Sequence, residues 1–275
     1  MPGVDGLRAV PVERPERPGA ALRVLDARSG GQVDIGTGHR SPLRVFVEET
    51  RAGAAAEPSG LRARLVADVL VRTAELHGGQ ALLGLVGTGA TRETHETRAA
   101  VLGIRPPAAS GTLDEVARAL GGRADVYVTA GREPAEQGVT VRVGEVRPYE
   151  RPSPAGLDAL ALRLALLTHP HHQPVAFTPE ELAAAHRTLE RWRRAVAHWA
   201  QAPSKPMCAE ILGQALAGLE EDLDVPVVLD ALNRLEADTG LPDGTKFETF
   251  TYLDRVLALE LTREIGHATP RDPLT

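Results

Sequence analysis

The first half of the chain alternates between two hydrophobic patterns. Short apolar runs of strand length lie at residues 43–47, 81–87, 124–130 and 139–144. Between the first two runs, residues 61–76 place four apolar side chains on one helical face: Leu61, Leu65, Val69 and Leu76. Residues 112–120 predict a shorter helix, with Thr112 as N-cap and Glu115 at capping-box spacing. Strands that alternate with helices predict a parallel sheet with crossover helices.

The second half carries only helical patterns, at residues 156–167, 178–200, 207–223, 226–240 and 246–266. Thr178, Pro179 and Glu181 give the second of these helices an N-cap, a proline at its first position and a capping box. Helices with short links predict a bundle. The fold class expected is therefore α/β, a reduced Rossmann-like parallel-sheet domain followed by an all-α helical bundle.

Three prolines within residues 146–156 place the boundary between the two halves. We expect a mobile N-terminal tail at residues 1–20 and a sheet domain at residues 21–148. A helical bundle should follow at residues 149–268, with a C-terminal tail at residues 269–275.

Composition limits the functions that fit this fold. The formal net charge is −6, so the basic surface typical of nucleic-acid binding is absent overall. The chain has one cysteine, Cys208, which fits a reducing compartment. No signal-peptide pattern begins the chain, and no apolar run reaches the length of a membrane span. We therefore expect a cytoplasmic protein.

Several spaced motifs of the second half agree in order with one family. Gly156–Arg163 reads as a Gly-x-Asp-x-x-x-x-Arg turn, and Glu221, Asp222, Asp224 and Pro226 form an acidic element that ends in proline. This half resembles the helical domain of cysteinyl-tRNA synthetases and of the related cysteine ligase of mycothiol synthesis. The resemblance covers roughly ninety residues, a typical small-domain length.

The first half then aligns with the catalytic domain of the same family. Glu48 stands where the family has a zinc-binding cysteine, and Glu57–Gly60 replaces its His-x-Gly-His motif. Thr88 and Gly89 stand where the family has a polar Asn-x-Thr-Asp run, and Gly138–Arg142 resembles the loop that carries Lys-Met-Ser-Lys-Ser. The family's large insertion between strands has no counterpart here.

The resemblance implies chemistry that these residues do not support. Such ligases join ATP and a carboxylate into an acyl-adenylate, and their histidines and lysines stabilise the phosphates. Loss of one such donor costs about 2.7–4 kcal/mol. Here Glu57, Val139 and Val141 replace them, and Arg142 is the one cation in its segment. Glu48 alone does not make a zinc site. We expect no cofactor, with ATP or an acyl-adenylate as the alternative.

Seven residues are the candidates for a ligand-binding crevice at the carboxyl ends of the strands: Glu48, Glu57, Ser59, Gly60, Thr88, Gly89 and Arg142. No residue is assigned a catalytic role. Ser59 has a second reading as the N-cap of the helix that follows, and the start of that helix offers N–H groups to an anion. Thr88 either points into the crevice or caps its strand.

Three further segments have competing readings. His169, His171 and His172 suggest a metal, but Pro170 breaks helical spacing and no carboxylate or cysteine follows at standard spacing, so no metal is expected. Cys208 is read as a packed thiol rather than a reactive one. Residues 191–199 mix arginine with tryptophan as nucleic-acid surfaces do, but the tryptophans fall on the apolar face and predict core.

Three functions follow from these patterns. The first is a non-catalytic relative of the ligases that acts as a binding or partner protein, and the missing motifs favour it. The second is an ATP-dependent aminoacyl ligase or transferase with a reshaped site, in cysteine or secondary metabolism. The third, a tRNA-binding protein, is disfavoured by the acidic charge. Because the missing insertion would leave a strand edge and an apolar face open, we expect a homodimer or a complex with another protein, with a small-molecule ligand as the alternative.

Overall fold

The computed structural model describes residues 22–36, 41–48, 57–87, 92–130, 138–147 and 156–266. Its strands are β1 (Arg23–Leu25), β2 (Gln32–Asp34), β3 (Leu43–Glu48), β4 (Ala81–Val86), β5 (Ala109–Gly111), β6 (Val126–Thr129), β7 (Val139–Arg142), β8 (Val146–Arg147) and β9 (Val175–Ala176). Its helices are α1 (Glu57–Leu76), α2 (Arg92–Val101), α3 (Leu113–Ala119), α4 (Ala159–Leu167), α5 (Pro179–Trp199), α6 (Ala209–Glu220), α7 (Val225–Ala237) and α8 (Asp243–Leu257).

The main sheet has five parallel strands in the order β5-β4-β3-β6-β7. Helix α1 connects β3 to β4 as a crossover, as the alternating pattern predicts. Val45 and Val47 face the same core as α1, whereas Phe46 packs on the opposite face with Val116 of α3 and with Leu120, the residue that follows this helix. Because both faces of β3 are covered, its apolar residues run on without alternation. The predicted α/β fold is confirmed.

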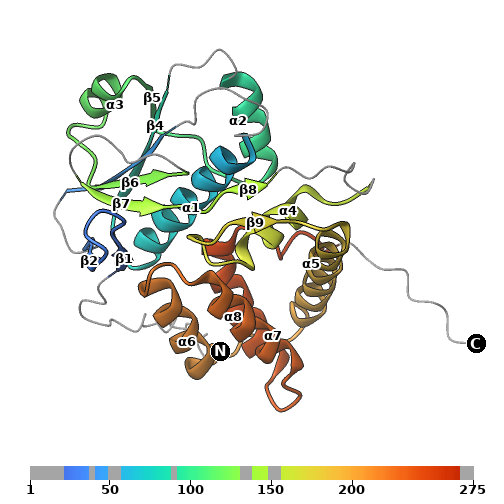
Figure 1. The fold of residues 1–275 in the computed structure, drawn as a ribbon. Coiled ribbons are helices and arrows are strands. Elements are labelled where there is room, and N and C mark those ends of the chain that lie inside the picture. The colour runs from blue at the N-terminus through green and yellow to red at the C-terminus, as the bar shows by residue number, and fades with distance from the viewer. Residues whose placement is uncertain are drawn as a thin grey trace, which may run out of the picture.

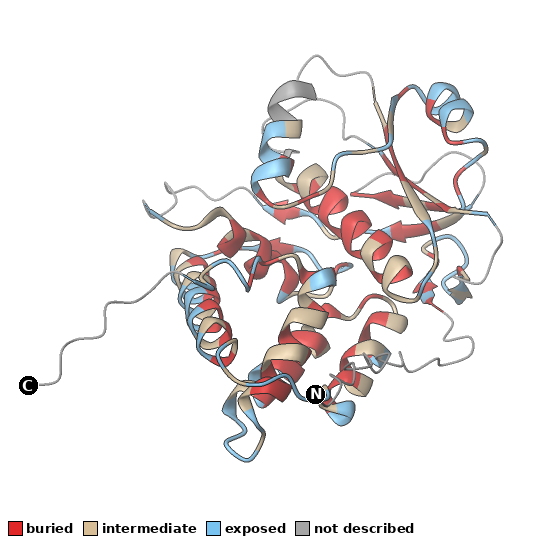
Figure 2. Ribbon diagram, turned by 180° about the vertical axis from the view of Figure 1, so that it is seen from behind, coloured by how far each residue is buried: buried red, intermediate tan, exposed pale blue. Residues whose placement is uncertain are grey.

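Helix α1 lies between the sheet and the helical half, where it contacts β3, β4, β6 and α8 (Figure 1). It is buried along most of its length, which Figure 2 shows as a nearly continuous red ribbon. Residues of both halves belong to one hydrophobic cluster around it. The predicted boundary stays a prediction, since residues 148–155 lie outside the described part of the chain, as do both predicted tails.

The predicted helix starts of the second half are largely confirmed. Thr178 caps α5, its hydroxyl accepting a hydrogen bond from the Glu181 amide at 3.2 Å, and the Glu181 side chain completes the capping box. Thr112 and Glu115 form the same box at α3. The last helix is shorter than predicted and ends at Leu257. Ala258 adopts a left-handed conformation (φ 50°), so the helix stops there.

The two edge strands of the main sheet are β5 and β7. β5 pairs with β4 over Gly84–Val86, and the expected partner contact at an open strand edge stays a prediction. At the other edge, the amide of Thr140 donates to Asp26 Oδ1 at 2.9 Å, and its carbonyl accepts from the Ala27 amide at 2.8 Å. Burial raises the pKa of the Asp26 carboxyl, but hydrogen bonds from the Thr140, Arg28 and Ser29 amides and from the Ser29 side chain outweigh it and hold the pKa below its usual value. The turn after β1 thus caps the edge strand β7.

Candidate functional site

The carboxyl ends of the parallel strands meet at one edge of the sheet, where open α/β sheets bind ligands. Because α1 runs back from β3 to β4, its first turn lies at this same edge. Of the seven crevice candidates, Glu48 is exposed at the end of β3, and Arg142 is exposed at the end of β7. Glu57 and Gly60 lie in the first turn of α1. Thr88 and Gly89 lie outside the described residues.

Ser59 has a structural role that differs from the predicted one. It is not the N-cap, because α1 already begins at Glu57. Its side chain is buried, and Oγ accepts a hydrogen bond from the Val146 amide at 2.9 Å. β8, which contains Val146, pairs with β9 of the helical half. The start of α1 is therefore fastened to a two-stranded sheet, and the Ser59 hydroxyl is engaged there.

The segment Gly138–Arg142 is the clearest departure from the expected site. The resemblance reads it as a loop, but residues 139–142 form β7, which pairs with β6 over four positions. Val141 is fully buried and Thr140 nearly so. The loop assignment is therefore wrong. An apolar strand segment buries its side chains and gains ladder hydrogen bonds, so this sequence is more stable in the sheet than in a loop.

Two arginines of α1 are buried, although the hydrophobic pattern of the sequence did not predict their burial. Arg62 donates to the carbonyls of Gly144 (3.0 Å), Pro170 (2.9 Å) and Gln173, and burial lowers its pKa to about 10. Arg64 pairs with Glu96 at 3.1 Å, and its Nη1 has no hydrogen-bond partner among the described atoms. Arginine counts as a polar residue in a hydrophobic pattern, so the pattern does not indicate that these two side chains are buried. The aliphatic stem of arginine nevertheless buries readily.

Arg163, which belongs to a motif that carries the resemblance, pairs with an aspartate of α1 in the core. Arg163 of the Gly156–Arg163 turn donates to Asp68 Oδ2 at 2.8 Å, and both side chains are fully buried. Asp158, from the same turn, caps α4 through the Leu160 amide and pairs with Arg193 at 2.6 Å. These retained residues join helices to one another. They hold the scaffold and do not line the strand ends.

The structure also places the three segments for which the sequence left competing interpretations: the tryptophans, Cys208 and the histidines. Trp192 and Trp199 are buried and pack edge-on against Phe250, which confirms the core reading. Cys208 is half-buried against the main core, as a packed thiol should be. His171 and His172 lie beside Asp222, a carboxylate that the sequence spacing did not suggest because a long stretch of chain separates them.

No protein-family model matches the chain. Several curated proteins are similar to part of it, and they share the name L-cysteine:1D-myo-inositol 2-amino-2-deoxy-alpha-D-glucopyranoside ligase. The one from Nocardiopsis dassonvillei is 42% identical over 89 residues, which are 32% of this chain and 21% of that protein. Part of the chain is thus similar to cysteine ligases. The counterpart from Geodermatophilus obscurus is 44% identical over 71 residues, 26% of this chain and 16% of that protein. The counterpart from Streptosporangium roseum is 34% identical over 108 residues, which are 38% of this chain and 26% of that protein.

The resemblance inferred from the motifs is confirmed as a relationship to the cysteine ligases. The alignments with these three proteins span only 16–26% of the ligases' own length. A relationship of this extent concerns a part of the chain and leaves the activity of the whole protein open. None of the described helices is long and apolar enough to cross a membrane.

Proposed function

We propose that this chain is a non-catalytic relative of the cysteine ligases that acts in the cytoplasm as a binding or partner protein. The observation that carries the proposal is the conversion of Gly138–Arg142 into the buried edge strand β7. A segment fixed by four ladder positions on one side and by Asp26 on the other cannot close over a nucleotide.

The charges at the strand ends support the same proposal. Adenylate formation needs positive or hydrogen-bonding groups aimed at phosphate oxygens, and one lost donor costs about 2.7–4 kcal/mol. Among the described candidates, Arg142 is the one positive side chain, Glu48 is a carboxylate, and the Ser59 hydroxyl is already engaged by the Val146 amide. Such losses compound within one catalytic unit, although they do not strictly add.

The alternative is an ATP-dependent aminoacyl ligase or transferase with a reshaped site. Arg64 is the observation that favours it. This guanidinium is buried in the second turn of α1, on the helix that begins at the strand ends, and its Nη1 lacks a partner in the described part of the chain. A buried unpaired donor is costly, and an anion would satisfy it. In this case cysteine and ATP, or an acyl-adenylate, would be the ligands.

Pyrophosphate exchange separates the two proposals. With L-cysteine and ATP, the purified full chain is expected to exchange no labelled pyrophosphate above the background of a protein-free mixture. A matched preparation of Gly60→Trp, which fills the first turn of α1, controls for host enzymes that copurify. Exchange by the wild-type protein that Gly60→Trp abolishes would overturn the non-catalytic proposal. Exchange that persists equally in both preparations would come from a contaminant.

The partner proposal is a homodimer or a complex with another protein. Because the turn after β1 is hydrogen-bonded to Thr140 of β7, we place the contact at the other edge strand, β5, and on the adjoining helices. Light scattering on the eluting peak, across a range of concentrations, is expected to give a dimer mass. A monomer at every concentration, with no partner recovered from the native host, would leave a small-molecule-binding protein in place of a partner protein.

A further inference from the structure

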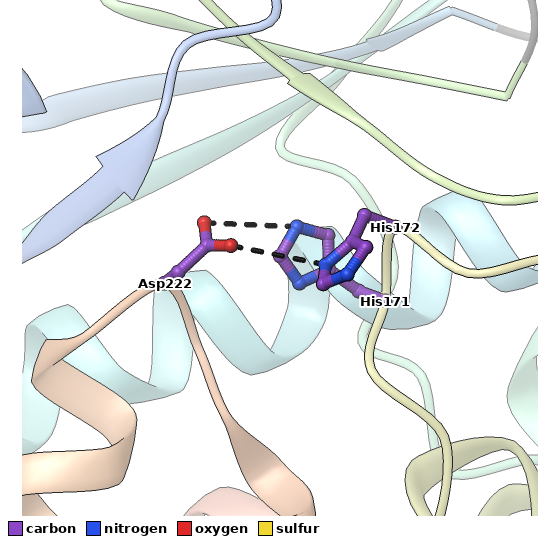
Figure 3. Close-up of side chains that lie close together, drawn as sticks. All are labelled: His171, His172 and Asp222. Atoms are coloured by element: carbon purple, nitrogen blue, oxygen red, sulfur yellow. Dashed lines mark ion pairs between the residues drawn. The ribbon is translucent and has the colours of Figure 1, made fainter. Parts of the chain in front are cut away.

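Three potential ligand groups converge where the loop after α4 meets the turn between α6 and α7. His171 Nε2 lies 3.8 Å from Asp222 Oδ1, and His172 Nδ1 lies 3.9 Å from Asp222 Oδ2 (Figure 3). One ligand atom from each residue lies within 4.8 Å of the other two. These separations exceed hydrogen-bond length, so the groups face one another across a gap instead of bonding directly. A gap of this size between two imidazoles and a carboxylate suits an ion.

Asp222 is held in position by the backbone. It and Leu223 adopt left-handed conformations (φ 55° and 53°), which are uncommon for residues other than glycine, asparagine and aspartate. Asp222 Oδ1 accepts the Leu25 amide at 2.8 Å, and the Asp222 amide donates to the Arg23 carbonyl at 2.9 Å. Strained backbone of this kind persists where the surrounding structure over-determines it, and it clusters at functional sites.

The histidine loop is fixed from the opposite side. The Gly144 amide donates to the His171 carbonyl at 2.8 Å, and Arg62 binds the carbonyls of Pro170 and Gln173. His171 is buried, whereas His172 is about half exposed. Both sides of the gap are therefore ordered before any ion arrives, and His172 leaves one side open to solvent.

We propose that His171, His172 and Asp222 bind a divalent transition-metal ion, with Zn²⁺ as the best fit, and leave one coordination position open. Two imidazoles and a carboxylate are a common three-ligand set for zinc, with water as the fourth ligand. At Zn–N and Zn–O distances of about 2.1 Å, tetrahedral ligands lie about 3.4 Å apart. The three ligand atoms lie within 4.8 Å of one another, so the separations need to shorten by up to about 1.4 Å through rotations of the side chains.

Electrostatics both favour and limit this site. Burial lowers the pKa of His171 to about 4, so at neutral pH its imidazole is neutral and can coordinate without losing a proton. Arg62 is the opposing factor, because its positive charge also acts on His171. One carboxylate offsets two added charges only in part. We expect weaker binding than at structural four-ligand sites, with a dissociation constant on the order of 1 µM.

A bound ion would link two segments that lie far apart along the chain. The histidines belong to the α4–β9 connection, and Asp222 belongs to the α6–α7 turn that also contacts β1. The ion binds the folded arrangement and not the separated segments, so it should raise the melting temperature as its concentration rises. None of the three residues is a crevice candidate, and the proposal does not depend on whether the chain forms adenylates.

The test uses the tag-free full chain, stripped of metal, titrated with Zn²⁺ in competition with a chromophoric chelator. We expect one ion per chain and a melting temperature that rises with Zn²⁺. His172→Ala should weaken binding about tenfold or more, because it removes one of three ligands. It changes a half-exposed side chain, so the variant should stay folded. Co²⁺ in the same site should give visible d–d absorption that His172→Ala abolishes.

His198→Ala is the matched control. His198 faces Asp243 at 3.7 Å on the surface, but that pair is not joined by a third ligand group in the described chain. Zn²⁺ binding should be the same in this variant as in the wild-type protein. The proposal is overturned if the wild-type chain binds no stoichiometric ion, or if His172→Ala and His198→Ala bind Zn²⁺ equally well.

Discussion

Replacement of Asp68 by asparagine is expected to lower the free energy of unfolding by about 3–5 kcal/mol, the usual cost of leaving one partner of a buried ion pair uncompensated. Asp68 accepts from Arg163 and Arg72, each at 2.8 Å, and both members of the Asp68–Arg163 pair are fully buried. Arg163 also donates to the carbonyls of Leu102 (3.0 Å) and Leu257 (2.6 Å). Burial lowers the pKa of Arg163, and the Asp68 charge is the main factor that opposes this.

The measurement is urea unfolding of Asp68→Asn, of Asp68→Leu/Arg163→Leu and of the control Glu260→Gln. Glu260 pairs with Arg263 at 3.8 Å on the surface, where such pairs contribute about 0–1 kcal/mol. The double variant should cost less than the sum of Asp68→Leu and Arg163→Leu, measured in the same way, since neither member of this pair stays behind as a lone buried charge and only Arg72 loses its carboxylate. A loss below about 1 kcal/mol for Asp68→Asn would show that this ion pair does not stabilise the junction between sheet and helices.

Trp192→Ala is expected to cost about 3–5 kcal/mol in unfolding free energy, as large-to-small changes in cores do. Trp192 is 1% exposed, its ring packs edge-on against Phe250 with 5.7 Å between centroids, and its Nε1–H donates to Glu236 at 3.0 Å. Alanine would leave a cavity between α5 and α8 and remove one of the two donors to Glu236 Oε2, the other being Arg191 Nε at 3.1 Å. Trp192→Phe should cost clearly less, because most of the volume stays filled.

The control for this prediction is Arg194→Ala, an exposed neighbour on the same helix, which should change stability by no more than about 0.5 kcal/mol. The pair of variants also tests the nucleic-acid reading of residues 191–199. Equal stability of Trp192→Ala and the wild-type protein, together with a loss of RNA binding, would mean that the tryptophan works at the surface and that its burial has been misjudged.

Periodicity predicted the elements whose environment is set locally. The strands at 43–47, 81–86 and 124–129 and the capping boxes at Thr112 and Thr178 all appear in the structure. The sequence pattern did not predict β1, β2, β5, β8, β9 and α2, because strands of two or three residues and a polar helix carry no clear apolar pattern. Residues 139–144 carry a strand-like apolar pattern, whereas the resemblance implies a loop at Gly138–Arg142. The structure has strand β7 there, as the local pattern predicts.

The sequence by itself determined the fold class, the order of the elements and the kinship with the cysteine ligases, since apolar periodicity and spaced motifs are properties of neighbouring residues. Only the tertiary structure decided which polar side chains meet. It buried Arg163 against Asp68, engaged Ser59 with Val146, and brought Asp222 to His171 and His172. Such pairs form between residues far apart along the chain. They depend on how the hydrophobic core orients whole elements, and no local spacing records that.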